Sequence, residues 1–78
     1  MPRYHFDIHE ADSVMEDWEG DKFVDLESAE RAARRSIAEL ISEQLRCKIS
    51  TMDWSMRIRE GGGGTVLTLA FIDILKSP

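Results

Sequence analysis

The chain has 78 residues, of which 42% are hydrophobic, and a formal net charge of -5 at pH 7. This length predicts a single domain over residues 1–78, which can bury only about 60–65% of the surface that the unfolded chain exposes. No apolar run approaches the roughly 20 residues that a membrane span needs, and the acidic charge would repel phosphate backbones. We therefore expect neither a membrane segment nor nucleic-acid binding.

Two further features predict a cytoplasmic location. Arg3, Asp7 and Glu10 interrupt the apolar core that a secretory signal would need among the first residues. The single cysteine, Cys47, cannot form an internal disulfide, which fits a reducing compartment.

Residues 3–10 alternate between apolar and polar side chains, which predicts a first strand. Its core side carries three apolar residues: Tyr4, Phe6 and Ile8. His5, Asp7 and His9 share the other side, and their types could supply metal ligands. On a straight strand, however, His5 and His9 lie about 13 Å apart, too far to chelate one ion. We therefore interpret this side as polar surface and predict no metal site and no cofactor.

Residues 12–24 belong to the acidic part of the chain. From Asp7 to Glu27 there are nine acidic residues and one base. Gly20 lies among acids and predicts a turn, and the apolar residues on either side predict a short strand or an irregular hairpin. The segment does not match a calcium loop, because Ser28 stands where a bidentate Glu would be required.

The residues from Asp25 to about Cys47 form the only segment that is long and periodic enough to predict a helix with one buried face. Asp25 is suited to cap its first turn. At about 100° per residue, seven residues fall within one stripe: Leu26, Ala29, Ala33, Ile37, Leu40, Ile41 and Gln44. We expect this stripe to face a sheet and the opposite side to face solvent.

Two strands should follow the helix. Residues 50–60 alternate, with four apolar residues on the core side: Met52, Trp54, Met56 and Ile58. The four glycines 61–64 free the backbone, so residues 65–75 should pair with the preceding strand as an antiparallel hairpin. This last segment is apolar on both sides, which is typical of a strand whose two faces are covered.

These elements predict a two-layer α+β domain, in which one amphipathic helix packs on a three- or four-stranded antiparallel or mixed sheet. The expected order is strand, short strand or turn, helix, strand, strand. One helix covers only one face, so four residues of the last strand would form an exposed candidate interface: Val66, Ala70, Ile72 and Ile74. We expect a homodimer through this outer face or through an edge strand. The alternative is a twisted last strand with scattered exposed apolar residues that need no partner.

The sequence does not assemble a catalytic site. Ser, His and Asp occur without an arrangement of nucleophile, base and orienting group. The glycine run resembles a phosphate loop only superficially, because no lysine follows it and a strand comes next. We therefore expect that the protein is not an enzyme.

Three stretches of the first half carry a recognisable pattern: PRYHFDI at residues 2–8, DWEG at residues 17–20 and DLESA at residues 25–29. They resemble a family of small uncharacterised bacterial proteins, mostly alphaproteobacterial, that open PRYxFD and continue DxEGxxxxDLExA before a helix. The resemblance implies a bacterial cytoplasmic protein with a domain of unknown function, and it transfers no catalytic residue. The pattern is compatible with structural roles, in which Asp25 caps the helix, Asp7 ties the first strand to a loop and Gly20 turns the chain.

The layout also resembles the antitoxin halves of toxin–antitoxin pairs, which join an N-terminal sheet to an acidic turn and an alanine-rich helix. That resemblance implies a docking site for a basic protein at Asp17, Trp18 and Glu19, with Trp18 as the aromatic anchor. The alternative for Trp18 is partial burial against its own sheet.

We predict a non-enzymatic protein-interaction module that self-associates through its sheet. One alternative is an antitoxin-like partner of a basic protein. Another is a small-ligand or metal-binding protein that uses a crevice between helix and sheet, or the surface formed by His5, Asp7 and His9.

Overall fold

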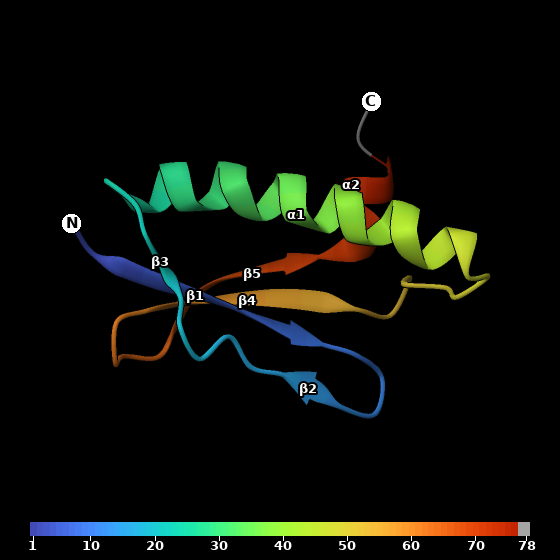
Figure 1. Ribbon diagram of the computed structural model, residues 1–78, viewed down its shortest axis with the longest axis horizontal. Coiled ribbons are helices and arrows are strands. Elements are labelled where there is room, and N and C mark those ends of the chain that lie inside the picture. The colour runs from blue at the N-terminus through green and yellow to red at the C-terminus, as the bar shows by residue number, and fades with distance from the viewer. Residues whose placement is uncertain (77–78) are drawn as a thin grey trace.

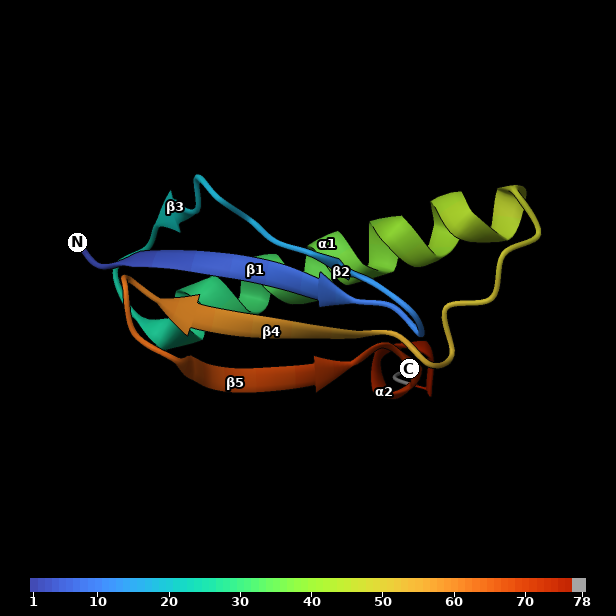
Figure 2. The ribbon, with the colours of Figure 1, turned by 90° about the horizontal axis from the view of Figure 1, so that it is seen from below.

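The computed structural model describes residues 1–76, which fold into two layers (Figure 1). The elements in chain order are β1 (Arg3–His9), β2 (Val14–Met15), β3 (Asp21–Lys22), α1 (Leu26–Arg46), β4 (Ser55–Glu60), β5 (Thr65–Ala70) and α2 (Phe71–Lys76). Helix α1 lies along one face of the sheet, and the opposite face is open in the view from below (Figure 2). The predicted α+β class, with one long helix on a sheet, is confirmed. Neither helix within residues 1–76 combines the length and apolar character that crossing a membrane requires.

The sheet is antiparallel, and β1 holds its centre. The strand order is β2-β1-β4-β5, and the short β3 pairs with the beginning of β1 on the edge that β2 also occupies. The register pairs Phe6 with Ile58 and Ile8 with Met56. Because side chains alternate along a strand, these apolar pairs share the face toward α1.

Helix α1 begins where the sequence predicts. The Asp25 carboxylate accepts a hydrogen bond from the backbone N–H of Ser28 at 2.8 Å, and this cap lowers the pKa of the Asp25 carboxyl. Four residues of the predicted stripe are buried in the core: Ala29, Ala33, Ile37 and Ile41. The two alanines and Ile37 are fully buried and Ile41 is 6% exposed, so the buried stripe runs along most of α1.

The strand predicted over residues 50–60 begins only at Ser55, so the prediction is wrong for its first five residues. Residues 50–54 instead form a turn in which the backbone N–H of Trp54 donates to Thr51 O at 3.0 Å. Thr51 is buried, whereas Met52 is 56% exposed and does not join the core. The physical reason is connectivity, because α1 ends in the helix layer and the chain needs these residues to return to the sheet.

The last strand is also shorter than predicted. It ends at Ala70, and the residues that follow form α2. Phe71 is fully buried, and its ring lies 5.7 Å from that of Trp54 in an edge-on contact. Ile74, three residues on, packs against the same core, and α2 packs against α1. The segment from Thr65 is apolar on both sides because it forms a short strand and then a short helix, and not one strand with two covered faces.

The outer face of the sheet is polar, contrary to the apolar face predicted from a longer last strand. Its cross-strand pairs join His5 with Arg59, Asp7 with Arg57, and Arg57 with Thr68. Of the predicted interface residues, only Val66 and Ala70 lie in β5. Ile72 and Ile74 lie in α2, so the four residues do not share one sheet face.

Candidate functional site

The polar face of the sheet holds a buried ion pair. The side chain of Asp7 is buried. The guanidinium of Arg59 donates two hydrogen bonds to the Asp7 carboxylate, from Nε to Oδ2 and from Nη2 to Oδ1, the second at 3.1 Å. Burial by itself raises the pKa of the Asp7 carboxyl. The hydrogen bonds from Arg59 and from the backbone N–H of Asp17, with the Arg59 charge, outweigh burial and lower this pKa below its ordinary value.

Asp17 ties the acidic loop to β1 between the two short strands. Its backbone N–H donates to Asp7 Oδ1 at 2.9 Å, and its carboxylate accepts the backbone N–H of Phe6 at 3.0 Å and that of Gly20 at 3.1 Å. Its carbonyl oxygen lies 2.7 Å from Nδ1 of His5. The Asp17 side chain therefore takes the place of a neighbouring strand at the one stretch of β1 that neither β2 nor β3 pairs.

Gly20 closes this loop in a conformation that only glycine fits well. Its φ is +67°, in the left-handed region. A Cβ atom at this position would lie 2.7 Å from the carbonyl oxygen of Tyr4 and 2.8 Å from the ring of His5. The turn predicted at Gly20 is present, and close approach to β1 is the reason for it.

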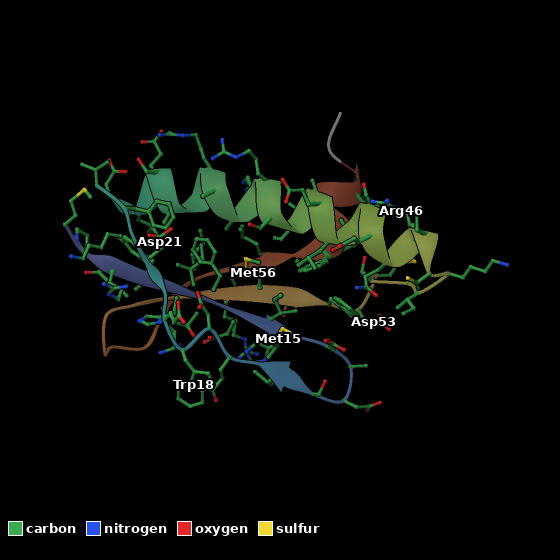
Figure 3. The ribbon with its side chains drawn as sticks, viewed as in Figure 1. Met15, Trp18, Asp21, Arg46, Asp53 and Met56 are labelled. Carbon is green, nitrogen blue, oxygen red and sulfur yellow. The ribbon has the colours of Figure 1, made fainter. Side chains whose placement is uncertain are left out.

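The loop presents Trp18 to solvent. The residue is 81% exposed, and its ring projects from the lower side of the loop, away from α1 (Figure 3). The predicted alternative of partial burial against the sheet is therefore wrong. Glu19 is also exposed, and its carbonyl accepts a hydrogen bond from Nη1 of Arg3 at 2.9 Å. Asp17 is the third predicted docking residue. Its carboxylate is directed toward β1 and Gly20, where it accepts backbone hydrogen bonds that hold the loop carrying Trp18 and Glu19.

The side chains of His5 and Asp7 in β1 are engaged with protein groups. His5 contacts Asp17 and Asp7 pairs with Arg59, so these two do not form a shared open surface with His9. Within residues 1–76, no three side chains of the His, Cys, Asp or Glu type are placed to hold a metal ion. The role suggested for Asp7, a tie between the first strand and a loop, is confirmed by its bond to Asp17.

The sequence prediction missed Arg59 as the partner of Asp7. Arg59 lies 52 residues further along the chain and appears in the sequence only as one of several polar residues in an alternating strand. Pairing the two predicted strands in antiparallel register would have brought acidic and basic residues to one face. The sequence pattern does not give the register of β1 against β4, so it could not identify Arg59 as the partner of Asp7.

A family model described as a domain of unknown function, DUF6894, matches residues 3–72. The chain belongs to the DUF6894 family. Comparisons with curated proteins and with solved structures give no match. The matched range runs from β1 into α2, so the DUF6894 domain includes the ion pair, the Asp17 loop and the open edge of the sheet.

Replacing Gly20 by Ala should destabilise the DUF6894 fold by about 2–4 kcal/mol, because the new Cβ would clash with Tyr4 and His5 at a strained φ. Gly62→Ala is the matched control, since a Cβ there meets open space. Urea unfolding followed by circular dichroism measures both. Equal stability of the two variants would contradict this account of the loop.

Replacing Asp7 by Asn should lower the free energy of unfolding at pH 7 by about 1.5–3 kcal/mol, because the charged hydrogen bonds to Arg59 are lost. Since the pKa of Asp7 is lowered on folding, its contribution is present above the ordinary aspartate pKa of about 3.9 and disappears as pH falls through the folded value. Stability measured from neutral to acidic pH should therefore fall less steeply in Asp7→Asn than in the natural chain.

The exposed Asp53 provides the control for this measurement. Asp53→Asn removes the same charge without touching the ion pair and should leave both the stability and its pH dependence nearly unchanged. If the two variants gave the same pH profile, Asp7 would not carry the acid sensitivity.

Proposed function

We propose that this DUF6894 protein is a non-enzymatic protein-interaction module that self-associates through its sheet, at the free edge of β5. The observation that carries the proposal is the character of that edge. Among the described strands, β5 has only β4 as a neighbour, and all six of its residues are uncharged. The edge is visible at the lower side of the sheet in Figure 2.

Edge strands of soluble monomers are usually protected against pairing by charges, by proline or by bulges. Strand β5 contains neither a charge nor proline, and Val66 is 45% exposed on it. A register irregularity does occur at the start of β5, where Val66 is the extra residue between Thr65, which pairs with Arg59, and Leu67, which pairs with Ile58. The remainder of β5, residues 67–70, is regular and open.

The hydrogen-bonding groups of this edge point outward at Thr68. Phe71 donates its backbone N–H to Trp54 O at 3.0 Å, toward the β4 side. Because these groups alternate along an antiparallel strand, Leu69 directs its backbone toward β4 and Thr68 directs its N–H and C=O away from the sheet. An antiparallel β5 of a second copy would satisfy both groups about a twofold axis. Val66 and Ala70 flank Thr68 and would lie in this interface.

Replacing Thr68 by Pro should abolish self-association, because proline removes the outward N–H and its ring obstructs a pairing strand. The bond pattern between β5 and β4 should survive, since the N–H of Thr68 does not point toward β4. Sedimentation equilibrium over a wide range of concentration should show a dimer for the natural chain and a monomer for the variant.

Thr68→Lys provides a second edge variant that keeps the backbone N–H and adds a charge. Ser42→Lys adds the same charge on the exposed side of α1 and should leave the dimer intact. A natural chain that stays monomeric at high concentration, or a Thr68→Lys variant that still dimerises, would refute pairing through β5.

A second candidate function is docking of a basic protein partner on the acidic loop. It is supported by the exposure of Trp18 on a segment that several hydrogen bonds hold in place. Because the loop backbone is already held in place, a partner that covers the indole need not order the loop, and tryptophan is enriched among residues that dominate binding energy. Glu16 and Glu19, the exposed acids on either side, would favour a basic surface.

Replacing Trp18 by Ala should leave folding intact, because the side chain is almost fully in solvent, and should weaken binding of such a partner at least about 30-fold. The partner would be recovered from native cells on the immobilised natural chain and its affinity measured by calorimetry. Met52→Ala removes another exposed apolar side chain and is the control. A partner that bound all three proteins equally would exclude Trp18 as the anchor.

A further inference from the structure

The sheet face beneath α1 is only partly covered, and the uncovered part forms a groove beside the helix. Two hollows, of about 310 and 240 Å3, are lined in common by Phe6 and Ile8 of β1. The first extends to Leu40 of α1, and the second extends to Met15 of β2. Met56 lies between helix and sheet at the inner side of this groove, and Met15 lies below it on β2 (Figure 3).

Burial falls steadily across the sheet toward this groove. Met56 and Ile58 of β4 are fully buried under α1. Phe6 and Ile8 of β1 are only partly buried, although they belong to the core face. Met15 of β2 is 60% exposed. The chain therefore leaves an apolar floor open to solvent on the side of β1 and β2.

Both rims of the groove are acidic. Glu39 and Glu43 of α1 line the first hollow, Glu16 lines the second, and neither hollow is lined by a basic residue. Two acids nearer the start of α1 form ion pairs. Glu27 pairs with Arg31, and Glu30 pairs with Arg34 at an N–O distance of 2.9 Å.

Within residues 1–76, Glu39 and Glu43 have no basic side chain within ion-pair distance. They lie four residues apart on the helix and repel each other. Arg46 lines a neighbouring hollow together with both glutamates but forms no ion pair with either of them. A cation that approached from the groove would be attracted to both carboxylates. A ligand that matched this groove would combine apolar groups, which would cover the floor, with basic groups, which would face the rims.

We propose that this groove binds a basic amphipathic segment of a partner protein. Apolar side chains of the segment would cover Phe6, Ile8 and Leu40, while its Lys or Arg side chains would reach Glu16 on one rim and the two α1 glutamates on the other. The groove of a second copy does not fit, because the two sets of acidic rims would face each other. The groove lies on the helix side of the sheet and requires neither the β5 edge nor Trp18.

The test uses a synthetic peptide of leucine and lysine with its leucines at positions i, i+3, i+4 and i+7, so that one helical face is apolar. It is titrated into the full chain by calorimetry and by amide NMR. Two control peptides are a scrambled sequence of the same composition and a peptide with Glu in place of Lys. The expected result is binding of the first peptide alone, with amide shifts at Ile8, Met15 and Leu40 and none at Thr68.

Two variants separate the groove from general charge attraction. E39Q/E43Q removes both α1 rim charges and should weaken peptide binding about 5- to 30-fold. D12N/D53N removes two exposed acids outside the groove and should leave the affinity unchanged. Met15→Ser, at an exposed position of the floor, should also weaken binding without affecting folding.

Three outcomes would overturn the proposal. The first is equal binding of the scrambled and amphipathic peptides, and the second is equal weakening by the two double variants, since either would show attraction to net charge alone. The third is the absence of binding at low ionic strength, where rim charges act most strongly.

Discussion

The architecture depends on one geometric constraint, namely that a single helix is narrower than the sheet it covers. An α-helix with its side chains is about 10–12 Å wide, whereas the outer strands of a four-strand path lie about 14 Å apart at the usual spacing. Helix α1 buries the apolar residues of β4, and α2 closes the end of β5 by burying Phe71. On β1, Tyr4 is buried and the ring of Phe23 stacks on that of Phe6 at 5.7 Å, whereas Ile8 is only partly buried and Met15 of β2 is exposed. The apolar surface left over lies beside the helix, on the same face of the sheet.

The opposite face is stabilised by polar contacts. The charged pair of Asp7 and Arg59 is shielded from solvent, and Asp17 connects it to the acidic loop. Because the Asp17 carboxylate accepts the backbone N–H of Phe6 in β1, it substitutes for a strand over the stretch of β1 between the parts that β2 and β3 pair. An acidic segment that would otherwise repel itself is in this way fixed to the sheet, and its exposed side is held in a defined shape.

Three surfaces of this DUF6894 domain are open to other molecules, and each has a different chemistry. The edge of β5 offers uncharged backbone groups, the loop at Trp18 offers an aromatic ring among acids, and the groove offers an apolar floor between acidic rims. The groove adjoins the Trp18 loop, because Glu16 and Asp17 line its second hollow, whereas β5 forms the opposite edge of the sheet from β2. A small domain with a limited core can gain stability from occupation of any of them.

The sequence by itself determined the elements whose periodicity is long or regular. The α1 stripe, the Asp25 cap and the alternation of β1 were readable, because each depends on residues that are near one another in the chain. The turn at Gly20 was readable from its residue type, but its close approach to Tyr4 and His5 of β1 was not. The α+β class followed from their order. The exposed position of Trp18 was not readable, since a tryptophan in an acidic turn fits either burial or display.

Only the tertiary structure decided where the apolar segments after α1 end. Residues 50–54 alternate like a strand but serve as the return from the helix layer, and the run from Thr65 changes from strand to helix at Phe71 because α1 offers a packing surface there. The register of β1 against β4, which places Arg59 opposite His5 and diagonally within reach of Asp7, was likewise decided by the tertiary structure. Local patterns determine which faces are apolar, but the coverage of each face depends on the widths and positions of elements that are distant in the chain.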